Sequence, residues 1–78
     1  MVDFQELRAQ VRREDFDLKA DYNVTKRGMG AVVYYITTQD DPSVGIFGER
    51  VSPYFRRVSA ADKWWMKNEK RLFKKYVG

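Results

Sequence analysis

The fold is decided by the stretch Phe16-Asp17-Leu18-Lys19-Ala20-Asp21-Tyr22-Asn23-Val24-Thr25, which alternates apolar and polar residues at every step. Successive side chains of a β-strand point to opposite faces, so the five apolar residues share one face and the five polar residues share the other. The stretch therefore predicts a strand over residues 16–25 with one face packed against a core.

A second strand is predicted directly after the first. The intervening residues Lys26-Arg27-Gly28-Met29-Gly30 contain two glycines, which supply the positive φ that a hairpin connection requires. The next eight residues, Ala31–Thr38, are rich in β-branched and aromatic side chains. Both faces of this strand are apolar, which favours a central strand or one whose outer face meets something else.

The region after the hairpin is apolar but irregular. A turn is expected over residues 39–43, where aspartate and proline gather. Glycine and proline at Gly45, Gly48 and Pro53 then interrupt the apolar pattern. We predict a third strand around Gly45–Val51 and an extended or edge segment at Tyr54–Val58, since proline cannot donate to a ladder.

A helix is predicted before the hairpin, over Asp3–Glu14. The apolar residues Phe4, Leu7 and Val11 recur at helical spacing, and an acceptor at Asp3 stands three residues before a carboxylate, as in a capping box.

A longer helix, Ala60–Val77, is predicted at the end of the chain, with Ser59 as its N-cap. One stripe of this helix is apolar and predicted to face the core; it holds Ala61, Trp65, Leu72 and Tyr76. Trp64 on one flank, and Met66, Phe73 and Val77 on the other, widen the apolar arc to about 220°. The first helix and residues 44–58 are candidates to cover these flanks, and a partner surface is the other.

Together these elements predict a single α+β domain over residues 1–78, in the order helix, three-stranded antiparallel sheet, helix. At 44% hydrophobic and 15% aromatic residues, the chain has the composition of a globular protein. No apolar run approaches the roughly 20 residues needed to span a bilayer. The first 15 residues carry seven charges, so no signal peptide is expected, and we predict a cytoplasmic, intracellular protein.

Two residue types that serve most small active sites are missing. The chain has no Cys and no His, which removes thiol nucleophiles, zinc fingers and the usual general base. The carboxylates do not converge in the predicted elements, and the glycines lack the flanking Lys and Ser/Thr of phosphate loops. We therefore expect a non-enzymatic protein with no catalytic residues, no metal and no cofactor.

The net charge of +4 is concentrated in one place. Residues 59–78 carry six basic and two acidic side chains, so the rest of the chain is neutral in sum. Five cations lie together on the side of the last helix opposite its apolar stripe: Lys63, Lys67, Lys70, Arg71 and Lys74. Such a stripe predicts contact with the phosphates of DNA or RNA, with Lys26, Arg27, Arg56 and Arg57 as a second patch.

The aromatic residues support an alternative function. Trp, Tyr and Phe are frequent anchors of protein interfaces, and the candidate anchors are Trp64, Tyr34, Tyr35, Tyr54 and Phe55. The alternative is a small protein-interaction module, such as a phage- or mobile-element-encoded modulator or inhibitor of a larger, acidic host complex. A homodimer is a further option for the same surface.

Overall fold

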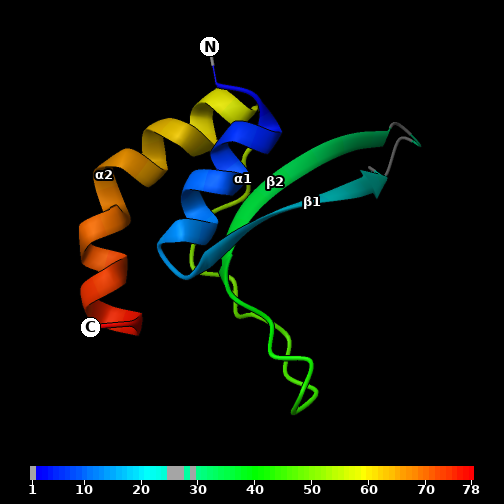
Figure 1. Cartoon of the computed structure of the whole chain (residues 1–78). Helices are drawn as coiled ribbons and strands as arrows, with labels where there is room; N and C mark the ends of the chain where they lie inside the picture. The colour runs from blue at the N-terminus through cyan, green and yellow to red at the C-terminus, as the bar shows by residue number, and fades with distance from the viewer. Residues whose placement is uncertain (1, 25–27, 29) are drawn as a thin grey trace.

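We describe the protein from a computed structural model that covers residues 2–24, 28 and 30–78. Its elements follow in the order α1 (Phe4–Arg13), β1 (Phe16–Val24), β2 (Gly30–Thr38) and α2 (Val58–Tyr76) (Figure 1). The α+β class predicted from the sequence is confirmed, with a helix at each end and an antiparallel hairpin between them. No helix within these described ranges is long and apolar enough to cross a bilayer.

Helix α1 begins where the capping pattern predicts. The Asp3 carboxylate accepts a hydrogen bond of 2.8 Å from the Glu6 backbone N–H, which satisfies one of the free amides of the first turn. The helix buries Leu7 and Val11. It ends in a tight turn that leads straight into β1, so α1 packs back against the start of the hairpin.

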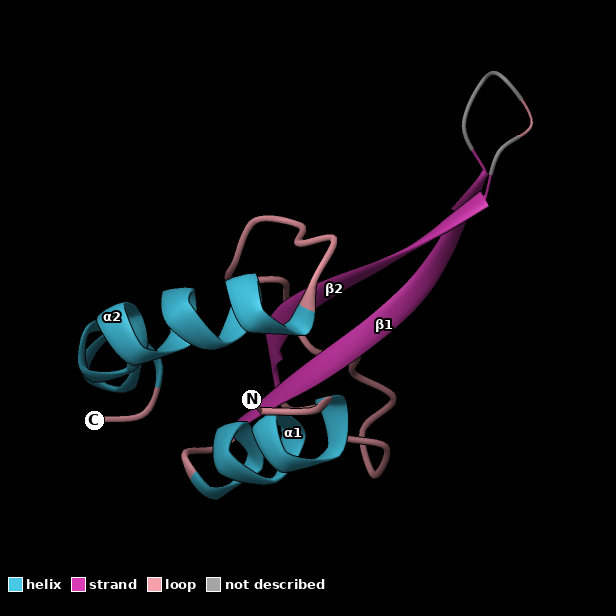
Figure 2. Ribbon diagram, turned by 90° about the horizontal axis from the view of Figure 1, so that it is seen from above, coloured by secondary structure: helices cyan, strands magenta, loops and turns pink. Residues whose placement is uncertain are grey.

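The two strands pair in one antiparallel register, with Leu18 opposite Ile36 and Tyr22 opposite Val32. The predicted burial of the apolar face of β1 is confirmed at the start of the strand, where Phe16 and Leu18 are buried with Ile36. Farther along the same face, Tyr22 is 68% exposed. Figure 2 shows the reason, because the two helices cover only the base of the hairpin and its far end extends beyond them. Thr25, predicted as the last residue of the first strand, lies outside the described residues.

The prediction of a third strand at Gly45–Val51 is wrong, since the described residues form a sheet of two strands. Residues 49–55 do run antiparallel along the second edge of β2, but only isolated bridges join them, at Thr37–Arg50 and Tyr34–Phe55. These partners are three positions apart on β2 and five apart on the segment. Two extra residues therefore bulge out between the bridges.

Two side-chain properties explain the break. Pro53 has no N–H to donate to a ladder. Next to it, the Ser52 hydroxyl takes the place of a backbone acceptor and receives a 2.8 Å hydrogen bond from the Ile36 N–H. Backbone pairing resumes at Phe55, which exchanges two hydrogen bonds of 2.7 Å with Tyr34. β2 thus lies between β1 and this segment, in the central position that its two apolar faces favour.

Helix α2 begins at Val58, and the prediction of Ser59 as its N-cap is wrong. The N-cap residue is Arg57, whose backbone is extended and whose side chain makes no capping hydrogen bond. Its carbonyl already accepts from the Ala61 N–H at 3.3 Å, so the first helical turn closes two residues earlier than predicted. Ser59 is an exposed residue inside that turn.

The predicted apolar stripe of α2 forms most of its contact with the core. Ala61, Trp65 and Leu72 are buried there. Tyr76 is only partly covered, but its ring meets Phe16 edge-on at 6.1 Å between centroids. The core cluster joins α1, the base of the hairpin and α2, and consists of Leu7, Val11, Phe16, Leu18, Ile36, Ala61, Trp65 and Leu72.

Helix α2 is bent in its middle, so that its second half turns toward the base of the hairpin (Figure 1). In this region the Asn68 side chain donates a 2.8 Å hydrogen bond to the Trp64 carbonyl, four residues earlier. Side chains that enter the helical hydrogen-bond ladder in this way are a known cause of bends. The bend brings Leu72 and Tyr76 around the end of the core.

Candidate nucleic-acid interface

The five cations predicted from the sequence all lie exposed along α2, and we call them the α2 cationic face. They point away from the buried stripe formed by Ala61, Trp65 and Leu72, because they occupy the opposite side of the helix. The face comprises Lys63, Lys67, Lys70, Arg71 and Lys74. One side of one continuous helix therefore carries five solvated positive charges in about three turns.

The charges of the α2 cationic face are not neutralised by ion pairs. Within residues 2–24, 28 and 30–78, the ion pairs join Arg8 and Arg12 to Asp17 and Lys19 to Asp40. None of them includes a cation of this face. Arg71 does make contacts within the protein, because it donates hydrogen bonds of 3.1 and 3.3 Å to the side-chain oxygen of Asn68, but that amide is neutral. The face thus keeps its positive charge.

The start of α2 adds to this positive field. Arg56 and Arg57 are exposed immediately before the helix, and its first turn contains no acidic residue. The N-terminal end of a helix carries a partial positive charge of its own. Of the predicted second patch, these two arginines therefore lie at the N-terminal end of α2. Lys26 and Arg27 lie outside the described residues.

Three of the predicted interface aromatics are half-buried at the junction of the helices with the sheet. Tyr34 packs on Phe4, with 5.8 Å between ring centroids, and Phe55 packs on Trp64 at 6.0 Å. Phe55 belongs to residues 44–58, one of the candidates to cover a flank of the last helix, and it does cover the Trp64 flank. These three rings therefore contribute to packing within the domain.

The other two predicted aromatics lie on the opposite face of the hairpin. Tyr35 and Tyr54 meet edge-on at 5.4 Å, and the Arg50 guanidinium stacks 4.4 Å from the Tyr54 centroid. The Tyr35 hydroxyl donates to Asp21; this hydrogen bond, helped by burial and by the negative charge of the carboxylate, raises the pKa of Tyr35 to about 12. Tyr35 is thus a neutral donor at physiological pH.

An exposed apolar loop between β2 and α2 was missed from the sequence, which predicted a strand there. Phe47 is 85% exposed, Val44 63% and Ile46 58%. The loop folds back through a bridge between Asp41 and Ile46 and projects away from both helices (Figure 1). Glycines on either side of the Ile46-Phe47 pair were the available signal for a loop.

The second predicted flank of α2 also remains uncovered. Met66, Phe73 and Val77 are exposed, and on the helix they lie beside the lysines of the α2 cationic face. The apolar arc of about 220° is therefore covered on the Trp64 side and open on this one. A partner that meets the cationic face would also meet these side chains.

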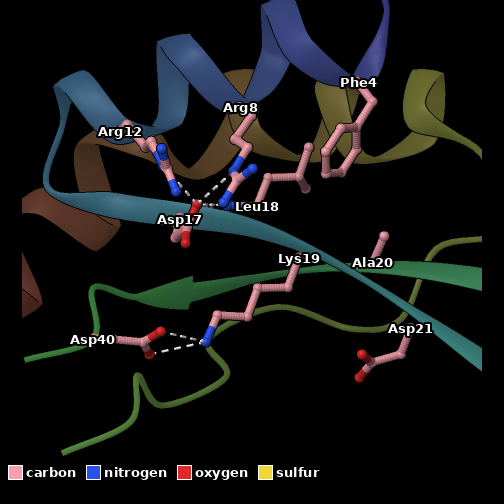
Figure 3. A pocket seen from close by; sticks show the side chains of 9 residues that line it. All are labelled: Phe4, Arg8, Arg12, Asp17, Leu18, Lys19, Ala20, Asp21 and Asp40. Carbon is pink, nitrogen blue, oxygen red and sulfur yellow. Dashed lines mark hydrogen bonds and ion pairs between the residues drawn. The ribbon is translucent and has the colours of Figure 1, made fainter. Parts of the chain in front are cut away.

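A groove between α1 and β1 is lined by charged residues whose proximity was not predicted from the sequence. Its volume is about 410 Å³, and Figure 3 shows its lining. The nearly buried Asp17 carboxylate accepts hydrogen bonds from Arg8 at 3.3 Å and Arg12 at 3.1 Å. Hydrogen bonds from Lys19 and from the Gly48 N–H lower the pKa of Asp40. These charges are paired within the protein and balance one another.

Comparison of the chain with protein-family models, with curated proteins and with solved structures finds no match. The function must therefore be argued from the side chains that the fold presents.

Proposed function

We propose that this protein binds the phosphate backbone of nucleic acid through the α2 cationic face. The proposal is carried by one observation: five exposed cations share one side of α2, and none of them forms an ion pair within the described part of the chain. Phosphate is the partner that such an unneutralised row of positive charges fits best.

The free energy of this binding comes from counterion release. A duplex carries a condensed layer of cations, and each phosphate that a Lys or Arg neutralises returns about one cation to the solution. Contacts of this kind depend little on base sequence, because they reach phosphate oxygens. The protein is thus proposed as a binder of general nucleic-acid backbone, with Arg56 and Arg57 extending the contact beyond the helix.

The salt dependence of binding tests this proposal. If all five cations meet phosphates of a duplex, the logarithm of the association constant should fall against the logarithm of salt with a slope of about −4.5. Between about 50 and 200 mM salt this slope weakens binding roughly 500-fold. Fluorescence anisotropy with labelled random duplex DNA and duplex RNA measures it, and an affinity that does not change with salt would contradict the proposal.

A second candidate function is favoured by the exposed loop. Val44, Ile46 and Phe47 form an apolar projection of the kind that inserts into a pocket of a partner protein. This supports the alternative of a small modulator of a larger complex. Affinity capture with and without nuclease separates the two candidates: a partner that survives nuclease treatment and is lost from the F47S variant would favour the loop.

A further inference from the structure

Phe73 is an exposed aromatic residue beside the α2 cationic face. It is 42% exposed, and it belongs neither to the core cluster nor to the residues packed against that cluster. It follows Lys70 by three residues, so one helical turn brings the two side chains together on the surface of α2. Among the described residues, none of the close ring pairs includes Phe73. Its ring is therefore accessible to a ligand that meets the cationic face.

Phe73 lines a hollow between the end of α1 and the second half of α2. The hollow has a volume of about 310 Å³, and its lining residues are Glu14, Glu69, Lys70 and Phe73. It shares no lining residue with the groove between α1 and β1. In the part of the chain that the structure describes, no ion pair includes Glu14, Glu69 or Lys70. The hollow therefore combines an aromatic ring with one positive and two negative charges.

The charges of this hollow are ordered around the ring. At 3.6 residues per turn, Glu69 lies about 40° to one side of Phe73 on the surface of α2, and Lys70 lies about 60° to the other side. Glu14 is at the end of α1, which packs against the buried stripe of α2, so it comes from the same side as Glu69. A nucleotide has the same order of groups: N–H donors on the edge of its base, a flat aromatic ring, and a phosphate.

We propose that this hollow binds one unpaired guanine of a single strand whose phosphates follow the α2 cationic face. The base stacks on Phe73, its Watson–Crick edge donates to the carboxylates, and its phosphate meets Lys70. Stacking of unpaired bases on aromatic side chains, with the backbone along a positive surface, is the usual mode of single-strand binding. The inference rests on the proposed function and narrows it, because a single strand gains a base contact that a duplex does not offer.

The two carboxylates select guanine among the bases. An ionised carboxylate only accepts hydrogen bonds, so it needs donors on the edge of the base. Guanine has two adjacent donors on its Watson–Crick edge, the N1–H and the N2 amino group, and one carboxylate can accept from both. Every other base places a nitrogen or oxygen lone pair beside its donor, which the negative charge of the carboxylate repels. In a duplex the guanine edge is already bonded to cytosine, so it cannot reach the hollow.

Removal of the ring is the first test, with labelled DNA single strands of about 12 nucleotides as probes in fluorescence anisotropy. One strand is all thymidine, and the other carries a single central guanine. We expect the natural chain to bind the guanine strand about fivefold more tightly, and F73A to lose about tenfold in affinity for it. The affinity of F73A for duplex DNA should change less than about twofold, since a duplex contributes only phosphates here. F47A, which removes an 85% exposed phenylalanine from the loop, is the matched control and should leave all three affinities unchanged.

Replacement of the carboxylates tests the choice of base. E14Q/E69Q should bind the all-thymidine strand more tightly, because less negative charge opposes the phosphates, and should lose most of the preference for the guanine strand. Carboxylates that only repel phosphate would instead leave the preference unchanged, since both affinities would rise equally. RNA strands of uridine with and without one guanine form a second arm, and the same preference is expected there because the edge of the base is the same.

The duplex probe separates failure of this inference from failure of the proposed function. If the natural chain binds duplex with the expected salt slope, but F73A binds the guanine strand as tightly as F47A does, the guanine site is wrong and the proposed function stands. A natural chain that binds neither duplex nor single strands at low salt would overturn both. Equal affinity of the natural chain for the two single strands would also contradict the guanine site. Circular dichroism of each variant is the control for folding.

Discussion

Replacing Lys67 and Lys70 together by glutamine should weaken binding to a random duplex about 60-fold at roughly 0.1 M salt. Both side chains are exposed in the centre of the α2 cationic face. Loss of two phosphate contacts removes about two released counterions, so the salt slope should also become shallower by about two. Anisotropy titrations over a range of salt concentrations measure both quantities in one experiment.

A matched control separates the position of the charge from its amount. Gln5 and Gln10 are exposed on α1, and Q5E/Q10E lowers the net charge by two from +4, as K67Q/K70Q does. The control should keep an affinity within a few-fold of the natural chain, since neither residue lies on α2. Equal losses in the two variants would mean that overall charge, and no particular face, attracts the nucleic acid.

Trp65→Ala should have the largest effect on folding. This side chain is 2% exposed, lies in the core cluster and meets Phe16 edge-on at 5.7 Å between centroids. Truncation of a buried Trp costs about 3–5 kcal/mol of unfolding free energy, through lost burial and the cavity left behind. A chain of this size has only about 4–12 kcal/mol in total, so much of W65A should be unfolded near body temperature.

The neighbouring tryptophan provides the comparison. Trp64 is half-buried on the flank of α2 against Phe55, so W64A should lose about half as much unfolding free energy as W65A or less. Urea denaturation followed by circular dichroism gives both values, at a common slope if the transitions are two-state. A W64A variant as unstable as W65A would contradict the packing described here.

The elements governed by local pattern were predictable. The capping pair at Asp3 and Glu6 placed the start of α1, and the alternation of residues 16–25 placed β1. Three of the four stripe residues of α2 are buried. In each case the signal lies within a few residues of the structure that it specifies, so neighbouring parts of the chain do not override it.

The parts that depend on other segments were not predictable in the same way. The third strand fails because the Ser52 hydroxyl bonds Ile36 and Pro53 offers no donor, a competition that appears only when the segment lies beside β2. The first residue of the helix is Val58 and not Ala60, because Arg57 supplies the first carbonyl as soon as the segment leaves β2.

The same distinction between local patterns and contacts with other segments applies to the residues of the candidate site. The cations of α2 followed from helical periodicity alone and lie exposed on one side. The aromatics could not be sorted by periodicity, because their burial depends on which ring faces them: Phe55 covers Trp64, and Phe4 covers Tyr34. The exposure of Phe47 was not predicted, because this residue belongs to an apolar run whose composition favours a strand.

The central claim, that the α2 cationic face is the binding surface, is tested most directly by a nucleic-acid footprint at single-residue resolution. The chain is small enough for assignment of its backbone amides by NMR, and a short random duplex can be titrated into the labelled protein. We predict that the largest shifts lie at Lys63, Lys67, Lys70 and Lys74 and at the start of α2. Shifts concentrated instead in the loop at Val44–Phe47, or the absence of shifts at low salt, would contradict the claim.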